Sequence, residues 1–383
     1  MTNEIEVTVI IPCLNEIETL EICIKKAQKC LKENQIIGEV LVADNGSTDG
    51  SQELARNCGA RVVDVPIRGY GAALIGGTHA AQGKYCIMAD ADDSYDFSNL
   101  MPYIIKLREG YELVMGNRFK GGIEKGAMPF LHKYLGTPVI SFIGRLLYRN
   151  NIGDFNCGMR GYNRESIEKL GLRTTGMEYA SEMIIQASLH GLKIAEVPTT
   201  LQIDGRSRKP YLSTWSDGWR HLKVLLLHSP DWLFLYPGIL MVMMGLFIMV
   251  LLIGGPVKIS NICLDINTML YGSAFVIIGV NVILFSVYSK IFATQTSYIP
   301  PDKSIEKVGR LTLEKGVVAG IILLVVGVAC SIFAVLLWKK QSFGDLDPTT
   351  IMHITIPAVS LCIIGTELMF GGFFIGILNI KRQ

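Results

Sequence analysis

The second half of the chain contains four long apolar segments, which limit the possible folds more than any other feature of the sequence. A helix needs about 20 residues to span a bilayer. Only short polar links separate the segments, so a soluble fold would leave little except lipid to cover them. The sequence therefore predicts four membrane-spanning helices, at about 232–252, 269–292, 316–338 and 354–380.

Lysine and arginine are distributed unevenly among the links, and the basic links of a membrane protein face the cytoplasm. The first link contains only Lys258, the third carries Lys339 and Lys340, and the second is the most basic. The chain also begins with acidic residues where a secretory signal would be basic. We therefore expect a multi-pass protein of the cell membrane, with its polar part and both termini cytoplasmic. The basic residues of the second link are Lys290, Lys303, Lys307, Arg310 and Lys315.

Glu367 is an acidic residue well inside the fourth apolar segment. Ionisable residues inside a membrane often mark a functional site. The alternative is a protonated carboxyl that is hydrogen-bonded to Thr366 or to a neighbouring helix. The sequence leaves both interpretations open.

Charge and cysteine content exclude two classes of function. The net charge is only +2, so no basic surface for nucleic acid is evident. The nine cysteines form no C-x-x-C pair and no His/Cys ligand pattern, so we expect no structural zinc site.

The first part of the chain alternates short β-rich runs with helical patterns. Such alternation predicts an α/β domain with a mainly parallel, doubly wound sheet. Ligands of such sheets bind beyond the carboxyl ends of the strands. The expected strands are 7–12, 39–44, 61–65, 85–90 and 113–116, and the expected helices are 19–33, 51–58 and 71–81.

Polar motifs follow several of these strands directly. The first strand leads into PCLNE (12–16), and the second leads into DNGSTDGS (44–51). Asp44 is placed to accept from a base N–H or a ribose hydroxyl, whereas Asp49 fits the cap of the next helix better. We therefore expect a nucleotide at this edge of the sheet.

Asp90 and Asp92 end the fourth strand, two residues apart. Carboxylate oxygens suit Mg²⁺ or Mn²⁺, and a donor diphosphate would complete the coordination. A D-x-D sequence alone is a weak signal, but the end of a buried strand strengthens it. In RGYGAA (68–73), Gly71 would let the backbone approach a phosphate closely, and Arg68 would supply a positive charge. Tight helix packing explains Ala72 and Ala73 equally well.

These motifs together resemble glycosyltransferase family 2, which implies the GT-A (Rossmann-like) fold. The match is closer to dolichol- and undecaprenyl-phosphate sugar synthases, such as dolichol-phosphate mannose synthase. It rests on GNRF (116–119), DFNCGMRGYNR (154–164) and EYASEMIIQASLHGLKIAEVP (178–198), and it covers roughly the first 230 residues.

The resemblance implies roles for individual residues. Asp92, Arg118 and Glu182 would be catalytic, with Arg118 on the acceptor phosphate and Glu182 near the acceptor or donor sugar. The family's second arginine falls on Gln202 here, so Arg206 or Arg208, around Ser207, would replace it. Asp90 and Asp92 would hold the metal. The expected nucleotide-binding residues are Pro12, Leu14, Asn15, Glu16, Asp44, Arg68, Gly71, Asp90 and Ala91.

Two amphipathic segments, about 130–149 and 211–227, fit helices that lie in the membrane interface. A core helix is the alternative for the first, in which Pro138 would interrupt the helix. We therefore expect a glycosyltransferase domain with interfacial helices at 1–229 and a transmembrane domain at 230–383.

The expected reaction is an inverting, metal-dependent transfer of a hexose from a nucleotide sugar (UDP-glucose or GDP-mannose class) to a polyisoprenyl phosphate. Homo-oligomers are common in the family. One rival is a processive polysaccharide synthase, but its Q-x-x-R-W motif does not occur here. The other is a non-catalytic membrane transporter or scaffold, which the intact Asp90, Asp92 and Arg118 argue against. The spans could still help to flip the lipid product.

Overall fold

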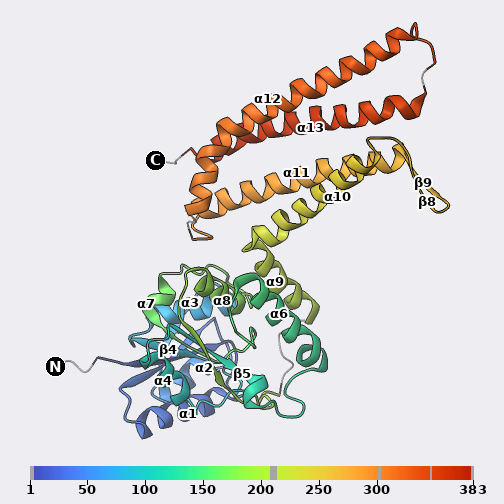
Figure 1. Ribbon diagram of the computed structural model, residues 1–383. Coiled ribbons are helices and arrows are strands. Elements are labelled where there is room, and N and C mark those ends of the chain that lie inside the picture. Colours follow the sequence, from blue (N-terminus) through green and yellow to red (C-terminus); the bar gives the residue numbers. More distant parts are fainter. Residues whose placement is uncertain (1–3, 208–213, 301–302, 346, 381–383) are drawn as a thin grey trace. The chain divides into compact units, whose positions relative to one another are not determined.

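The computed structural model describes residues 4–207, 214–300, 303–345 and 347–380. The chain divides into two compact units, Met1–Leu225 and Leu226–Gln383. We call them the polar unit and the helical unit, and Figure 1 shows the elements of each.

The polar unit is built around a seven-stranded sheet in the order β3-β2-β1-β4-β6-β5-β7. The predicted α/β architecture and its mainly parallel sheet are confirmed, because every neighbouring pair is parallel except those of β6 with β4 and with β5. The strands are β1 (Val7–Cys13), β2 (Gly38–Asp44), β3 (Arg61–Asp64), β4 (Tyr85–Met88), β5 (Leu113–Asn117), β6 (Arg160–Asn163) and β7 (Ile194–Pro198).

Strand β6 has no counterpart among the expected strands. Its sequence, RGYN, contains no β-branched residue and no apolar alternation. It is extended because it pairs with β4 on one side and β5 on the other. Its antiparallel direction reverses the segment that carries DFNCGM, and this reversal brings residues 154–159 to the carboxyl ends of β4 and β5.

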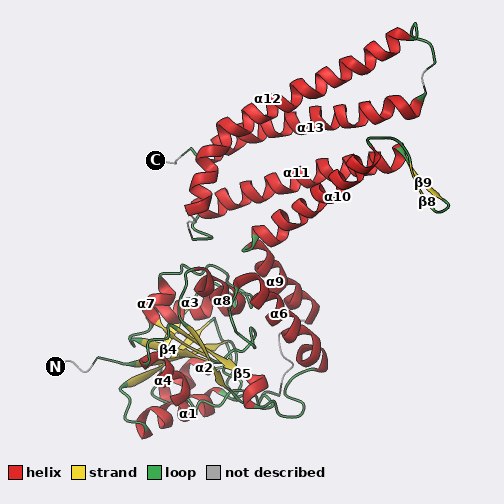
Figure 2. Ribbon diagram, viewed as in Figure 1, coloured by secondary structure: helices red, strands yellow, loops and turns green. Residues whose placement is uncertain are grey.

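Helices cover both faces of the sheet, as Figure 2 shows. Alternate side chains of β1 belong to different cores: Val9 packs in the cluster that includes α1 and α4, and Ile10 in the cluster that includes α3 and α8. This alternation is the period of two expected for a strand buried on both faces. The helices are α1 (Leu20–Glu33), α2 (Ser51–Asn57), α3 (Tyr70–Ala80), α4 (Met101–Arg108), α5 (Arg118–Gly121), α7 (Arg164–Glu168) and α8 (Tyr179–Leu189).

The two segments expected in the membrane interface are helical where the structure describes them. The first is a π-helical turn, η1 (His132–Gly136), which continues into α6 (Thr137–Tyr148). Pro138 lies in the first turn of α6, where the missing N–H is tolerated, so it does not end the helix. The second is α9 (Thr214–Leu227), and residues 211–213 of that segment lie outside the described ranges.

The helical unit contains four helices that are long and apolar enough to cross a membrane, at Asp231–Leu252, Ile266–Gln295, Glu314–Lys340 and Thr349–Leu378. Residues 257–264 of the first link form a small antiparallel hairpin. Four of the basic residues expected in the second link lie in α12 itself, which begins at Lys303. The elements are η2 (Asp231–Leu235), α10 (Tyr236–Leu252), β8 (Val257–Ile259), β9 (Ile262–Leu264), α11 (Ile266–Gln295), α12 (Lys303–Lys340) and α13 (Pro348–Leu378).

Glycines let the helices of this unit approach closely. A Cβ on Gly245 would lie 2.4 Å from the Gly272 carbonyl oxygen, so α10 and α11 pack backbone to backbone there. Between α11 and α13, the Asn281 amide donates to Glu367 Oε1 at 2.7 Å. Glu367 is therefore hydrogen-bonded to a neighbouring helix, which is one of the two partners expected for a protonated carboxyl. The other expected partner, the Thr366 hydroxyl, donates to the Cys362 carbonyl.

Candidate functional site

The carboxyl ends of β1, β2 and β4 surround a cavity of about 400 Å³, which we call the strand-end cavity. Parallel strands place the residues that follow them at one edge of the sheet, which explains why motifs far apart in sequence meet here. Of the residues predicted to bind a nucleotide, those that line the cavity are Pro12, Leu14, Glu16, Arg68, Asp90 and Ala91.

The other three residues predicted to bind a nucleotide support the walls of this cavity. Asn15 accepts from the Thr48 N–H at 2.8 Å and has a positive φ of 56°, so it shapes the turn after β1. Asp44 Oδ2 accepts the backbone N–H groups of Gly46 and Ser47 at 2.9 and 3.0 Å. Asp44 Oδ1 is buried and has no hydrogen-bond partner among the described residues.

Gly71 completes this group and lies at the start of α3. A Cβ at this position would lie 2.3 Å from the Thr174 carbonyl oxygen. Gly71 is therefore required for close packing against residues 174–176.

Asp90 and Asp92 both line the strand-end cavity. Asp92 Oδ1 accepts from the backbone N–H and the hydroxyl of Ser94, at 3.1 and 2.6 Å. Burial, followed by the neighbouring charge of Asp92, raises the pKa of Asp90 to about 6. The ionised form of Asp90 is therefore disfavoured in this cavity.

This arrangement fits a divalent cation held by two carboxylates and completed by substrate oxygens. Among the described residues, no group of three or more His, Cys, Asp or Glu side chains is arranged to hold a metal alone. A donor diphosphate would therefore have to supply further ligands.

Arg206 lines the strand-end cavity, although the sequence led us to expect it at an acceptor phosphate. Its guanidinium donates to Asp92 Oδ2 at 2.7 Å and to Glu16 Oε1 at 3.3 Å. Its Nε–H is buried without a hydrogen-bond partner among the described residues. The segment reaches the cavity because the Gln202 and Gly205 N–H groups bond the carbonyls of residues 94 and 92, both at 2.9 Å.

Ser207, the residue after Arg206, lines neither the strand-end cavity nor the second cavity described below. Ser207 donates its N–H and hydroxyl to Glu18 at 2.7 and 2.6 Å. Arg208 lies outside the described residues. Of the two described residues expected at the acceptor phosphate in this segment, Arg206 lines a cavity and Ser207 does not.

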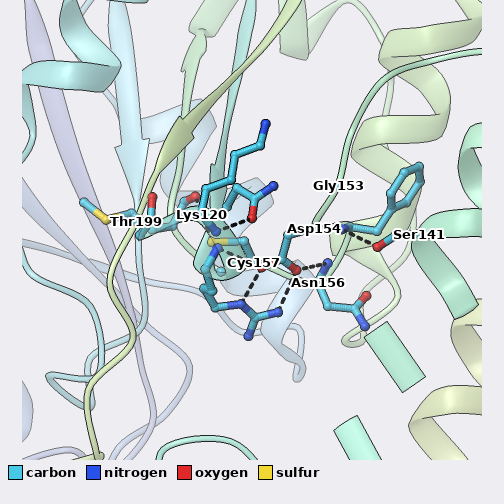
Figure 3. A network of polar contacts seen from close by, with 12 residues as sticks. Lys120, Ser141, Gly153, Asp154, Asn156, Cys157 and Thr199 are labelled. Atoms are coloured by element: carbon cyan, nitrogen blue, oxygen red, sulfur yellow. Dashed lines mark hydrogen bonds and ion pairs between the residues drawn. The ribbon is translucent and has the colours of Figure 1, made fainter. Parts of the chain in front are cut away.

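Arg118 lies at the start of α5 and is 8% exposed. Its guanidinium makes a forked ion pair with Asp154, with Nε–Oδ2 and Nη2–Oδ1 distances of 2.7 and 2.8 Å. Asp154 is fully buried and belongs to a polar network with Asn156, Ser141 and Lys120, which Figure 3 shows. Asp154 belongs to the DFNCGM motif, but the sequence alone gave no sign that it pairs with Arg118.

Arg118 also lines a second cavity of about 580 Å³, which we call the apolar cavity. Most of its wall is hydrophobic and comes from residues 128–143 and from α9. Arg118, Asp90 and Asn156 supply polar groups, and Asn156 Oδ1 is buried without a partner among the described residues. A ligand with an anionic head and a hydrocarbon tail matches such a surface.

Glu182 lines neither cavity in the structure. Its buried carboxylate accepts the backbone N–H groups of Arg173 and Thr174 and the Thr174 hydroxyl, at 2.6–3.1 Å. Glu182 therefore anchors the segment that packs on α3, and its expected place near the acceptor or donor sugar stays a prediction.

Comparison with known proteins identifies the family. Residues 8–171 match the profile described as Glycosyl transferase family 2, and residues 287–379 match its C-terminal transmembrane region. The low-salt glycan biosynthesis hexosyltransferase Agl6 of Haloferax volcanii is 32% identical over 373 residues, which are 97% of this chain and 89% of that protein. The dolichyl-phosphate hexose transferase of the same organism is 31% identical over 180 residues, which are 43% of this chain and 77% of that protein.

A solved structure also aligns with the chain. It is the glucosyl-3-phosphoglycerate synthase of Mycobacterium tuberculosis in complex with Mn²⁺, UDP and glucosyl-3-phosphoglycerate. The alignment covers 58% of this chain and 78% of that one, with 23% identity and a TM-score of 0.46. The profile matches and the full-length relative confirm the family resemblance and the GT-A fold read from the sequence. The chain belongs to glycosyltransferase family 2 and is a glycosyltransferase with a transmembrane region.

Proposed function

We propose that the protein transfers a hexose from a nucleotide sugar to a polyisoprenyl phosphate at the cytoplasmic face of the cell membrane. One observation carries the proposal: the strand-end cavity and the apolar cavity share Asp90 in their walls. A donor bound in one and an acceptor bound in the other would therefore meet beside a carboxylate suited to a metal. The name of the dolichyl-phosphate hexose transferase relative supports the same acceptor class.

The strand-end cavity supplies what a nucleotide diphosphate requires. Asp44 Oδ1 would accept an N–H of the base or a hydroxyl of the ribose, since it is buried and unpartnered among the described residues. Arg206 and Arg68 would face the diphosphate, because both line this cavity. Asp90 and Asp92 would hold Mg²⁺ or Mn²⁺, which when bound supplies positive charge to the leaving diphosphate. Either a uracil or a guanine donor is compatible with these groups.

The apolar cavity supplies what a lipid phosphate requires. Arg118 would bind the phosphate, and its pair with Asp154 fixes the guanidinium before the substrate arrives. The hydrophobic wall would take the first isoprene units. A phosphate is ionised at pH 7 and attacks the anomeric carbon directly, so no strong general base is needed and the configuration inverts. Preorganised charge would supply most of the rate acceleration.

The surface of residues 130–148, which include η1 and α6, supports contact with the membrane interface. Phe130, Tyr134 and Phe142 are 73, 63 and 59% exposed, respectively. Soluble surfaces rarely expose so many large apolar side chains together. We propose that η1, α6 and α9 lie in the headgroup region and guide the lipid phosphate into the apolar cavity. The distribution of Lys and Arg among the links supports a cytoplasmic side for the basic second link.

A single substitution tests this membrane contact. Phe142→Glu is expected to raise the KM for a long polyisoprenyl phosphate about tenfold, because a charged residue no longer favours the interface. The KM for a short, water-soluble isoprenyl phosphate should not change. Ile105→Glu is the matched control, since Ile105 is 46% exposed on α4, outside this surface. Equal effects of the two substitutions on the long acceptor would contradict the proposed contact.

The transfer itself is tested with purified protein in detergent. UDP-glucose or GDP-mannose is supplied with Mg²⁺ or Mn²⁺ and undecaprenyl phosphate, and release of nucleoside diphosphate is measured. We expect release that depends on both the lipid phosphate and the metal. Release that is independent of the lipid phosphate would contradict the acceptor assignment. A product with more than one sugar would favour a processive synthase.

A further inference from the structure

Arg206 is bonded to one of the two carboxylates that are proposed to hold a cation. Its Nη2 donates to Asp92 Oδ2 at 2.7 Å and to Asp204 Oδ2 at 3.1 Å, and its Nη1 donates to Glu16 Oε1 at 3.3 Å. The other carboxylate oxygen of Asp92, Oδ1, accepts from the N–H and the hydroxyl of Ser94 at 3.1 and 2.6 Å. Both oxygens of Asp92 are therefore engaged by the protein, and a cation at Oδ2 would lie close to the guanidinium.

A divalent cation and a guanidinium repel each other strongly when both contact one buried carboxylate. Asp92 is 7% exposed and the side chain of Arg206 is 14% exposed, so water screens little of this repulsion. A free Mg²⁺ or Mn²⁺ ion must therefore replace the guanidinium on Asp92, and the arginine then loses its bond to a buried charge. The affinity for a free cation should be lower than Asp90 and Asp92 would give without Arg206.

The backbone on both sides of Arg206 is anchored. The Gly205 N–H bonds the Asp92 carbonyl at 2.9 Å, and Ser207 donates its N–H and its hydroxyl to Glu18 at 2.7 and 2.6 Å. Arginine side chains move between staggered rotamers without a change in the backbone. Arg206 can therefore change its partner by side-chain rotation while the segment stays in place.

A nucleoside diphosphate offers Arg206 an alternative partner. Arg206 lines the strand-end cavity, in which the diphosphate is proposed to bind, and its Nε–H is buried without a hydrogen-bond partner among the described residues. A guanidinium can bind phosphate oxygens through two N–H groups at once. A cation that arrives with the diphosphate therefore brings oxygens that replace the carboxylate for Arg206, whereas a free cation does not.

We propose that Arg206 pairs with Asp92 until a cation and the nucleoside diphosphate group bind together, and that its guanidinium then moves to the diphosphate. Arg206 thereby couples the two ligands, because it weakens the binding of a free cation and strengthens the binding of a nucleotide with its cation. This inference rests on the proposed function, because it requires the donor diphosphate to occupy the strand-end cavity.

The first test compares Arg206→Gln with Lys26→Gln in the full-length protein in detergent. Lys26 pairs at 2.7 Å with Asp93, the neighbour of Asp92, and lines neither cavity. Its replacement removes a positive charge nearby but leaves the contacts of Asp92 intact. Binding of Mn²⁺ alone is measured by electron paramagnetic resonance. We expect Arg206→Gln to bind Mn²⁺ about tenfold more tightly than the wild type, since no guanidinium competes for Asp92, and Lys26→Gln to bind it as the wild type does.

The second test measures the binding of UDP and GDP at saturating Mn²⁺ by isothermal titration calorimetry. Arg206→Gln should bind the nucleotide about tenfold more weakly, because it loses a charge-assisted contact with the diphosphate. Arg206→Lys keeps a cation beside Asp92, so it should bind Mn²⁺ alone about as weakly as the wild type does. Replacement of Arg206 by glutamine thus has opposite effects on the two ligands, which a general loss of stability would not produce.

Binding of Mn²⁺ alone that is unchanged or weaker in Arg206→Gln would overturn the inference, and so would nucleotide binding equal to that of the wild type. Equal gains in Mn²⁺ affinity for Arg206→Gln and Lys26→Gln would also overturn it, because they would reflect net charge alone. Thermal unfolding in the same detergent verifies that the variants are folded. If the wild type transfers no sugar to lipid phosphate, the proposed function fails, while the two titrations still decide the role of Arg206.

Discussion

Replacement of Arg118 by alanine is expected to lower kcat/KM for the lipid phosphate by on the order of 10²–10³-fold, because a buried charge contact of about 2–5 kcal/mol is lost. The KM for the nucleotide sugar should change little, since Arg118 lines only the apolar cavity. Steady-state kinetics with each substrate varied in turn measures both quantities. The same substitution leaves Asp154 buried without its ion-pair partner, which is expected to cost about 3–5 kcal/mol of stability.

Two further variants separate activity from folding. Arg118→Lys keeps a positive charge beside Asp154 but loses the forked geometry, so it should fold and still transfer poorly. Arg108→Ala removes an arginine that makes a similar fork to Glu6 at 2.7 and 2.8 Å, but on the surface. Arg108→Ala should leave transfer unchanged and lower the free energy of unfolding by at most about 1 kcal/mol. Full kcat/KM for the lipid phosphate in Arg118→Lys would contradict the role given to Arg118.

Asp92→Asn is expected to reduce metal-dependent transfer by on the order of 10²–10³-fold. The substitution preserves size and keeps an oxygen for Ser94, but it removes the charge that would bind the cation. It also removes the partner of Arg206, whose guanidinium lies 2.7 Å from Asp92 Oδ2. Transfer rates over a series of Mn²⁺ concentrations measure the effect. The Mn²⁺ concentration needed for half-maximal rate should rise, and the maximal rate should fall.

The adjacent residue provides a matched control for this substitution. Asp93 pairs with Lys26 at 2.7 Å and lines neither cavity, so Asp93→Asn should retain nearly full activity. An Asp92→Asn protein with the rate and Mn²⁺ dependence of the wild type would remove the basis for the proposed metal site. Equal losses in the two variants would indicate that the turn after β4 is sensitive to any substitution.

Sequence reasoning predicted the strands whose signal is local. The runs that became β1, β2 and β4 are mostly apolar because both faces of the sheet are covered. The polar residues that follow them mark the carboxyl ends of the strands. Strand β6 carries no such signal, because RGYN becomes extended only by pairing with β4 and β5. Pairing between distant segments cannot be read from the period of a single segment.

The residues of the candidate site also differ in whether a local sequence signal could predict them. Asp90, Asp92 and Arg118 were singled out by motif, and the structure puts each of them in the wall of a cavity. The sequence could not indicate that Arg206 folds back onto Asp92, or that Glu182 binds a backbone segment. Those contacts join residues separated by long stretches of chain or depend on a loop conformation, and many arrangements are compatible with the same motifs.

The four apolar segments by themselves determined that part of this protein lies in a membrane, because apolar helices of that length require lipid to cover them. The ordered motifs determined the glycosyltransferase family. Only the tertiary structure decided how the site is assembled: one cavity with acidic groups and another with an apolar wall, joined at Tyr70, Asp90 and Met177. The physical reason is that each short motif carries its own functional groups, whatever the rest of the chain does. The position of two cavities side by side depends on how strands and loops distant in sequence pack together.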